Sequence, residues 1–279
     1  GLGGWQPRRA TLTEQRKFGD CKDLATLLTS RLRNAGITAY TACLLTRNAG
    51  VTDTTFPAVL FNHVISLAVV EGDTIWMDPA CNQCPLGELP LGDEATVTLV
   101  SADDGGRLCL TRPSTANDNV TTRAVTLMIQ PDYSVAFDAS IEAVGNYALY
   151  LRSVLDGATP DEQRRVIEAS FPEVGTRYVV DSFSVSRLNM IYEPVQVRVF
   201  GHSVRPERVF RSTLYHSPYL MHRTAGLLDL QLEGRTAPLD LSYPRTIRDI
   251  LTVRWAPELA VDSAVAPQET RADYSFGDV

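Results

Sequence analysis

One helix near the start of the chain has both ends marked by residue type, and it constrains the fold around it. The helical pattern covers residues 11–36 and is divided at Gly19, with a short helical turn at Thr13–Lys17 before the main helix. Asp20 suits the N-cap, and Asp23 occupies the capping-box position three residues later. Gly36 suits the end of the helix. Cys21 shares the apolar stripe, so we expect it in the first turn of a buried helix; the other stripe residues are Leu24, Ala25, Leu28, Leu32 and Ala35.

Strand patterns follow this helix. Residues 37–46 and 61–70 are rich in apolar and β-branched side chains, and residues 74–78 form a third short run. The turn residues Glu71-Gly72-Asp73 separate the second run from the third. The sequence therefore predicts a β-hairpin built from the second and third strands.

The predicted hairpin brings two polar residues together if its loop has two or four residues. In that case the numbers of two directly paired residues add up to an odd value. The numbers of His63 and Asp78 also add up to an odd value, so the two side chains lie on the same face of the sheet, directly opposite or diagonal to each other. A three-residue loop without a bulge would place them on opposite faces. The expected neighbours are thus a histidine and a carboxylate within hydrogen-bond reach.

Length and composition indicate a two-domain globular chain. It has 279 residues, of which 44% are hydrophobic and 21% charged. We expect a boundary in the polar stretch around residues 113–119, which gives domains 1–116 and 117–279. The second is expected to be β-rich with a helical insert at 145–171; its strand patterns cover 120–130, 133–142, 176–188, 194–201 and 246–255.

Charge and hydropathy exclude some partners. The formal net charge of −7 argues against a nucleic-acid binder, which needs a basic face. No apolar run is long enough to be a transmembrane segment. The chain opens with Gly1 and not with Met, so we do not expect Gly1 to be the natural start. The lack of a signal peptide therefore says nothing about export.

The five cysteines are too few for a disulfide scaffold. Cys81 and Cys84 form a CxxC pair, but a zinc site would need a second such pair or a histidine pair. A thioredoxin-like site would need a helix after the first cysteine, whereas Pro85 and Gly87 indicate a loop. We expect a loop disulfide or two free thiols.

Cys21, His63 and Asp78 together have the composition of a nucleophilic triad. A helix N-terminus lowers the pKa of a thiol, and its free N–H groups can bind an oxyanion. Asp78 can accept from one ring nitrogen of His63 and leave the other for Cys21. Each residue alone is more simply read as part of a core, but their conjunction predicts a Cys-His-Asp site.

Three sequence blocks resemble the transglutaminase-like (papain-like fold) superfamily. They are Gly19-Asp20-Cys21-Lys22-Asp23-Leu24-Ala25, Phe61-Asn62-His63-Val64-Ile65 and Trp76-Met77-Asp78-Pro79. The opening Gly3-Gly4-Trp5-Gln6-Pro7-Arg8 is similar to a bacterial branch in which such a core lies between two β-rich domains of unknown function. The resemblance is specific over residues 1–90, looser over 91–116 and weak beyond.

This resemblance implies an α+β fold. Its papain/transglutaminase-like core would have the nucleophile helix packed on an antiparallel sheet, followed by the β-rich domain. It implies Cys21 as nucleophile, His63 as base and Asp78 as the residue that orients it. It also implies that the N-terminal part of the core is missing and that the protein is periplasmic or in the cell envelope of a Gram-negative bacterium. Separately, the tail 256–279 has no recognisable terminator, so we expect the C-terminal domain to be truncated.

The expected activity is that of a cysteine peptidase or amidase, or of a transglutaminase-type acyltransferase. A peptide or protein substrate would pass through a thioester at Cys21, with hydrolysis favoured by the resemblance. Alternatives are a catalytically silent scaffold or binding module of the envelope, and acyl transfer of the arylamine N-acetyltransferase type. No cofactor or metal is expected, and the oligomeric state is not predicted.

Other residues give weaker signals. Gln15, six residues before Cys21, could contribute to an oxyanion hole, although a solvated helix residue is the simpler interpretation. Gln6 and Trp5 could line the cleft or form a structural turn. The remaining histidines are interpreted as structural or surface residues; they are His202, His216 and His222.

Overall fold

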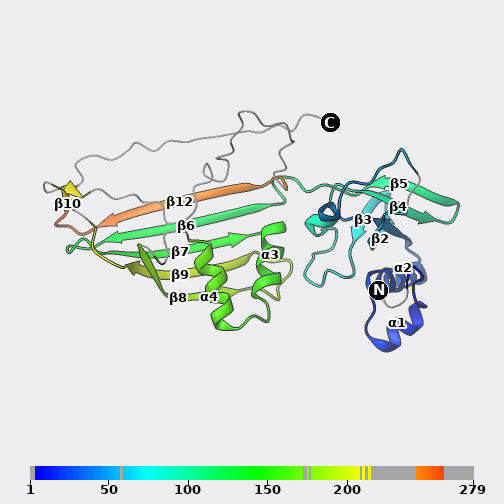
Figure 1. The fold of residues 1–279 in the computed structure, drawn as a ribbon, viewed down its shortest axis with the longest axis horizontal. Coiled ribbons are helices and arrows are strands. Elements are labelled where there is room, and N and C mark those ends of the chain that lie inside the picture. Colours follow the sequence, from blue (N-terminus) through cyan, green and yellow to red (C-terminus); the bar gives the residue numbers. More distant parts are fainter. Residues whose placement is uncertain are drawn as a thin grey trace.

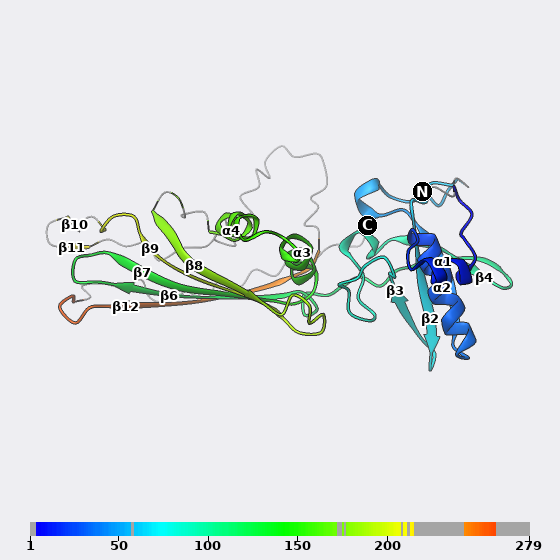
Figure 2. The same ribbon diagram turned by 90° about the horizontal axis from the view of Figure 1, so that it is seen from below.

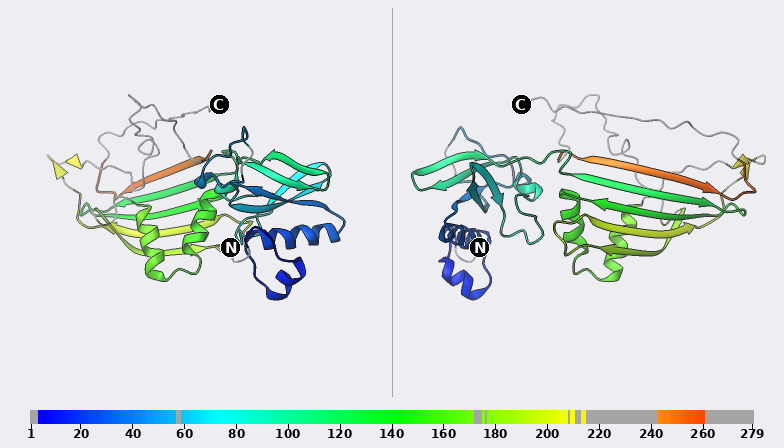
Figure 3. Two further views of the ribbon diagram at one scale, coloured as in Figure 1. Left: turned by 45° about the vertical axis from the view of Figure 1, so that its right-hand side comes forward. Right: turned by 180° about the vertical axis from the view of Figure 1, so that it is seen from behind.

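The computed structural model describes residues 4–56, 59–171, 175, 177–207, 209–210, 213–214 and 243–260. These residues contain two five-stranded sheets and a separate two-stranded ribbon. The two large sheets lie at opposite ends of the molecule, and the chain crosses from one to the other once before the second sheet begins (Figure 1). The same separation is visible from two other directions (Figure 3).

The first sheet has the strand order β3-β2-β1-β4-β5, and every neighbouring pair is antiparallel. Its helix α2 packs against β1 and β2, and α1 packs against α2. The elements are α1 (Ala10–Arg16), α2 (Cys21–Asn34), β1 (Thr38–Leu44), β2 (His63–Val70), β3 (Asp73–Met77), β4 (Val97–Ala102) and β5 (Gly105–Leu110), with short 3-10 turns η1 (Arg47–Ala49) and η2 (Leu91–Asp93).

The β2–β3 hairpin has the register that the sequence predicts. Val70 pairs with Asp73, so the loop is the two residues Glu71 and Gly72. Both have positive φ, 52° and 93° respectively, which matches the right-handed twist of the flanking strands. Along the whole hairpin each odd-numbered residue pairs with an even-numbered one. This register places the end of β3 beside the first half of β2.

The buried face of α2 differs from the expected stripe. Ala25 and Thr29 face the sheet: the Thr29 hydroxyl donates to Ser66 Oγ at 3.2 Å, and Ser66 Oγ donates to the Ala25 carbonyl at 3.1 Å. Leu24 and Leu28 instead line an apolar groove of about 330 Å³ between α2 and α1. The predicted start and end of the helix are confirmed, with the capping box at its N-terminus and Gly36 at φ 82° after its end.

The second sheet has the order β12-β6-β7-β9-β8, with β12 parallel to β6 and the other pairs antiparallel. Side chains alternate between buried and exposed along β7 and β9, and α3 and α4 cover one face (Figure 2). The elements are β6 (Val120–Ile129), β7 (Val135–Ala143), α3 (Asn146–Leu155), α4 (Pro160–Ala169), β8 (Tyr178–Ser186), β9 (Val195–Ser203), β12 (Thr246–Trp255) and the ribbon of β10 (Val209–Phe210) and β11 (Thr213–Leu214).

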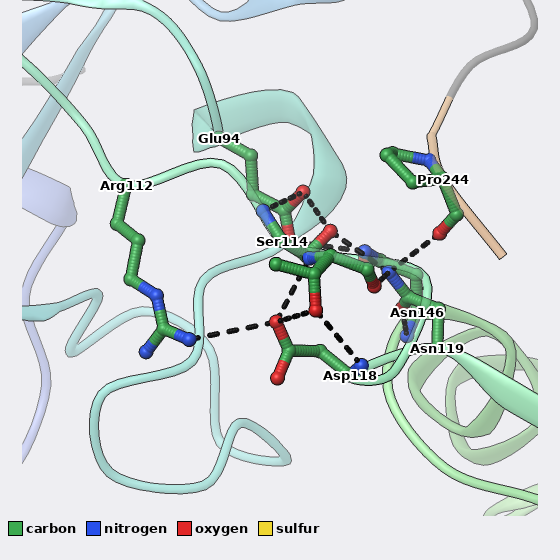
Figure 4. Close-up of polar contacts among 8 residues, drawn as sticks. Glu94, Arg112, Ser114, Asp118, Asn119, Asn146 and Pro244 are labelled. Atoms are coloured by element: carbon green, nitrogen blue, oxygen red, sulfur yellow. Dashed lines mark hydrogen bonds and ion pairs between the residues drawn. The ribbon is translucent and has the colours of Figure 1, made fainter. Parts of the chain in front are cut away.

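A polar cluster joins the two parts of the chain (Figure 4). Glu94, next to η2, accepts hydrogen bonds from the Ser114 hydroxyl at 2.6 Å and from Asn146 Nδ2 at 2.9 Å. Asn119 Nδ2 donates to the Pro244 carbonyl at 3.0 Å. The loop before β4 is therefore fixed to the linker, the start of α3 and the segment before β12.

The expected fold class is wrong. We expected an α+β fold whose papain/transglutaminase-like core has the nucleophile helix packed on an antiparallel sheet, but the described residues are mostly β-sheet with few helices. The hydrophobic cluster of the first sheet comes from strands and one loop; its members are Ala42, Leu44, Ile65, Leu67, Trp76, Leu89 and Val100. The helices add fewer buried residues, Ala25 at the first sheet and Ala148, Leu151, Leu155 and Ile167 at the second. The boundary at residue 116 stays a prediction.

Within the described residues, none of the helices combines the length and the apolar character that crossing a bilayer requires.

Candidate functional site

The start of α2 is built by residues around Cys21. A Cβ on Gly19 would lie 2.6 Å from Asp23 Cβ, so only glycine leaves room for the turn. The Asp20 side chain caps the helix by accepting from the Asp23 backbone N–H, and the Asp23 side chain accepts from the Asp20 backbone N–H. Asp23 is 1% exposed and also accepts from the Arg8 backbone N–H at 2.7 Å and from its guanidinium at 2.8 Å. This network fixes the N-terminal turn that carries Cys21.

Cys21 is a half-buried free thiol whose pKa is lowered. The largest influence is its hydrogen bond with His63, which favours the thiolate. Burial opposes this, and the backbone N–H groups of Val64 and Lys22 add to the lowering. Lys22 itself forms an ion pair with Asp20. The surroundings of Cys21 thus favour an anionic sulfur.

His63 lies at the start of β2, opposite Leu44 of β1, and Asp78 directly follows β3. The structure places His63 Nε2 3.2 Å from Asp78 Oδ2. Burial alone would lower the pKa of His63, but hydrogen bonds to Asp78 and Cys21 and the charge of Asp93 raise it to about 10. The ring is therefore held as an imidazolium, in contact with the Cys21 sulfur and with the carboxylate of Asp78.

Asp93, at the end of η2, is a site residue that sequence reasoning missed. Its Oδ2 lies 3.6 Å from His63 Nε2, so two carboxylates face the same ring nitrogen. The residue is 3% exposed, and its Oδ2 has no hydrogen-bond partner among the described residues. Burial first, with the neighbouring charge of Asp78, raises the pKa of Asp93 to about 7 although His63 opposes the rise. No periodic pattern marks this loop residue in the sequence.

The weaker sequence candidates do not join this cluster. Gln15, Gln6 and Trp5 are exposed, Trp5 by 64%, and no hydrogen bond to the site is recorded for them within the described ranges. Cys81 and Cys84 form a disulfide, one of the two expected outcomes. His202 is exposed and contacts Asp181 at 2.9 Å. His216 and His222 lie outside the described residues.

The arrangement combines two chemical capacities. Cys21 and His63 form a hydrogen-bonded thiol–imidazole pair of the kind that performs nucleophilic chemistry. His63, Asp78 and Asp93 also offer three ligand atoms that all lie within 4.8 Å of one another. These three residue types are also donors to divalent metal ions.

Comparisons with known proteins give little further guidance. No family model matches the sequence, and no curated protein matches it. A crystal structure of a "putative protease" from Parabacteroides distasonis is similar at a TM-score of 0.34 and 15% identity, over 73% of this chain. The chain spans 41% of the length of that protein. A likeness of this size carries no argument about fold or activity, so the function is argued from the site.

Proposed function

We propose that this chain is a thiol-dependent enzyme that cleaves amide bonds, with Cys21 as nucleophile, His63 as acid and base, and Asp78 as the residue that orients His63. The observation that carries the proposal is the chain of contacts from Cys21 to His63 and from His63 to Asp78 at 3.2 Å. The sequence blocks that resemble the transglutaminase-like superfamily support the same three roles.

The reaction follows from the protonation states. The Cys21 thiolate attacks the carbonyl carbon of a peptide or side-chain amide, and the backbone N–H groups at the start of α2 would bind the oxyanion. His63 donates a proton to the nitrogen as the C–N bond breaks, which leaves a thioester on Cys21. Water then attacks the thioester while His63 takes its proton, and the acid product and the thiol are released.

The first test measures the pKa of Cys21 by pH-dependent alkylation in a Cys43→Ser/Cys109→Ser background. We expect an alkylation midpoint well below that of an ordinary thiol, which rises when His63 is replaced by Ala. The matched control is His202→Ala, which removes an exposed histidine–carboxylate pair and should leave the midpoint unchanged.

The second test asks for the covalent intermediate. An activated peptide ester should acylate Cys21, detected as an added mass on the peptide that contains it, and Cys21→Ser should remove the signal. An unshifted thiol together with no acylation would contradict the proposal and favour a silent scaffold or binding module.

We also propose a location in the bacterial cell envelope or periplasm. The resemblance suggests it, and the Cys81–Cys84 disulfide supports it because disulfides persist mainly in oxidising compartments. Trapping of free thiols in intact cells checks this proposal: a reduced pair at Cys81 and Cys84 would contradict it.

A further inference from the structure

We propose that His63, Asp78 and Asp93 form a binding site for one Zn²⁺ ion at Nε2 of the imidazole ring. Occupation of this site would switch off the thiol chemistry, and that consequence rests on the proposed function. The binding itself does not, because it uses no atom of Cys21.

The geometry of the cluster fits a small tetrahedral ion. Metal–ligand bonds of about 2.0–2.2 Å to nitrogen and oxygen place two ligand atoms of a tetrahedron roughly 3.4 Å apart. His63 Nε2 lies 3.2 Å from Asp78 Oδ2 and 3.6 Å from Asp93 Oδ2. Three protein ligands leave the fourth position for water, as in many zinc sites with an open position.

The buried oxygen of Asp93 is the observation that calls for a ligand. The Asp93 side chain is 4% exposed and directed at His63, yet its Oδ2 accepts no hydrogen bond from the described residues. A buried polar atom without a partner is expensive and is usually explained by a bound water or ion. The competing explanation is a proton shared between the carboxylates of Asp93 and Asp78. Such a proton would occupy an oxygen that a metal ion needs as a ligand.

Charge balance favours a divalent cation over a proton above neutral pH. With both carboxylates ionised, the imidazolium of His63 neutralises only one of them. A Zn²⁺ ion bound to two carboxylates and a neutral imidazole gives a cluster without net charge, which suits a buried place. Imidazole nitrogen also selects zinc over Mg²⁺ and Ca²⁺, which prefer oxygen.

Binding has a direct consequence for the ring. The ion takes the position of the Nε2 proton, which leaves to solvent, and the ring can no longer alternate between imidazole and imidazolium. The Cys21 thiolate then loses the partner that gives and receives its proton. Zinc would act as a reversible inhibitor of the site.

The experiment measures Zn²⁺ affinity of the full chain by competition with a chromophoric chelator. We expect one ion per chain both in the natural sequence and in Cys21→Ala, and a loss of about tenfold or more in Asp93→Asn. The control His202→Ala should bind as the natural chain does. Absence of binding, loss of binding in Cys21→Ala, or unchanged affinity in Asp93→Asn would overturn the proposal.

Cobalt gives a readout that does not depend on the Asp93 variant folding. Co²⁺ in the natural chain should show the d–d absorption of a tetrahedral ion without a sulfur-to-cobalt charge-transfer band. Such a band would mean that Cys21 is a ligand, and would overturn the proposed site. Cys21→Ala should bind zinc whether or not Cys21 is catalytic. A failure of the zinc site can therefore be distinguished from a failure of the proposed enzyme function.

Discussion

The carboxyl group of Asp93 contributes to the dependence of the stability of this chain on pH. Its pKa is raised from 3.8 to about 7, chiefly by burial, so between these values the folded chain keeps a proton that the unfolded chain releases. The free energy of folding gained by keeping this proton is fully present below pH 3.8, and it is lost as the pH rises through 7. Asp93→Asn, which cannot ionise, should avoid this loss.

The expected result is that Asp93→Asn matches the natural chain near pH 4 and exceeds it above pH 7. The difference should be on the order of 2 kcal/mol, because one pKa unit corresponds to about 1.4 kcal/mol and the variant also loses an attraction to His63. Urea unfolding from pH 4 to 8 with a chelator present measures it. Asp103→Asn, on an exposed side chain, is the control; a difference that does not change with pH would refute the prediction.

At the residue scale the sequence was informative where chemistry and periodicity coincide. Cys21 could be placed by the helix cap, and the odd-sum register brought His63 and Asp78 together. Asp93 could not be found in this way, since it ends the three-residue turn η2, which follows Pro90 and has no periodic pattern. Its role depends on where that loop packs, and a pattern within the chain does not encode this.

At the element scale, one buried serine ties the nucleophile helix to the sheet. Ser66 is fully buried, and it donates to the Ala25 carbonyl while accepting from the Thr29 hydroxyl. Ser66→Ala should lower the free energy of unfolding by about 1–3 kcal/mol, because it leaves buried groups without partners. Thr29→Val in the same background should recover part of the loss.

Urea unfolding of these variants is the measurement, and Ser101→Ala supplies the control. Ser101 lies in β4 of the same sheet but is exposed, so its replacement should change the stability by less than about 0.5 kcal/mol. Equal effects for Ser66→Ala and Ser101→Ala would mean that this contact does not hold α2 in place.

The β2–β3 turn sets the register on which the pairing of His63 with Asp78 depends. Gly72 has φ 93°, and a Cβ there would meet nothing within 4 Å, so Gly72→Ala tests the backbone conformation alone. We expect a loss of about 1 kcal/mol. Glu71→Asn should act in the opposite direction by a few tenths of a kcal/mol, because asparagine tolerates the left-handed conformation better than glutamate.

Thermal unfolding of both variants checks this pair. Opposite signs for the two changes in Tm are the expected pattern. If Glu71→Asn were as destabilising as Gly72→Ala, the two-residue turn with both residues at positive φ would not describe this hairpin.

Elements were easier to predict than their packing. Strand patterns and caps located most helices and strands within a few residues. The sheet-facing side of α2, however, differs from the predicted apolar stripe, because Leu24 and Leu28 line a groove and Thr29 faces the sheet. Helical spacing defines a face, but it does not say which of two neighbouring faces meets the sheet. A polar pair such as Thr29 and Ser66 gives no hydrophobic signal at all.

At the scale of the whole molecule, the fold class depended on pairings that local patterns do not contain. β12 pairs in parallel with β6, more than a hundred residues earlier, and β4 joins β1 and not the hairpin. The α+β prediction relied on resemblance, and it was wrong because two sheets dominate the described chain and their strands supply most residues of both cores. The sequence predicted the elements, but it could not show which of them build the interior.

Asn119 ties the linker to α3 and to the segment before β12. It is 3% exposed; its Nδ2 donates to the Pro244 carbonyl at 3.0 Å and to Ser114 Oγ at 2.8 Å. Its Oδ1 accepts from the backbone N–H of Asn146 at 2.8 Å, at the start of α3. Asn119→Ala leaves several buried groups unpaired at once, including a helix N-terminal N–H that no other side chain is recorded to cap within the described residues.

We expect Asn119→Ala to lower the free energy of unfolding by about 2 kcal/mol, since each unsatisfied buried group costs roughly 1–3 kcal/mol. For a chain of this size that corresponds to a fall in Tm of roughly 4–8 °C. Scanning calorimetry measures it, with Asn189→Ala at an exposed turn as the matched control. Because Glu94 of the same cluster neighbours Asp93, the variant should also bind Zn²⁺ more weakly; a normal Tm and normal zinc affinity would show that the second sheet does not support the site.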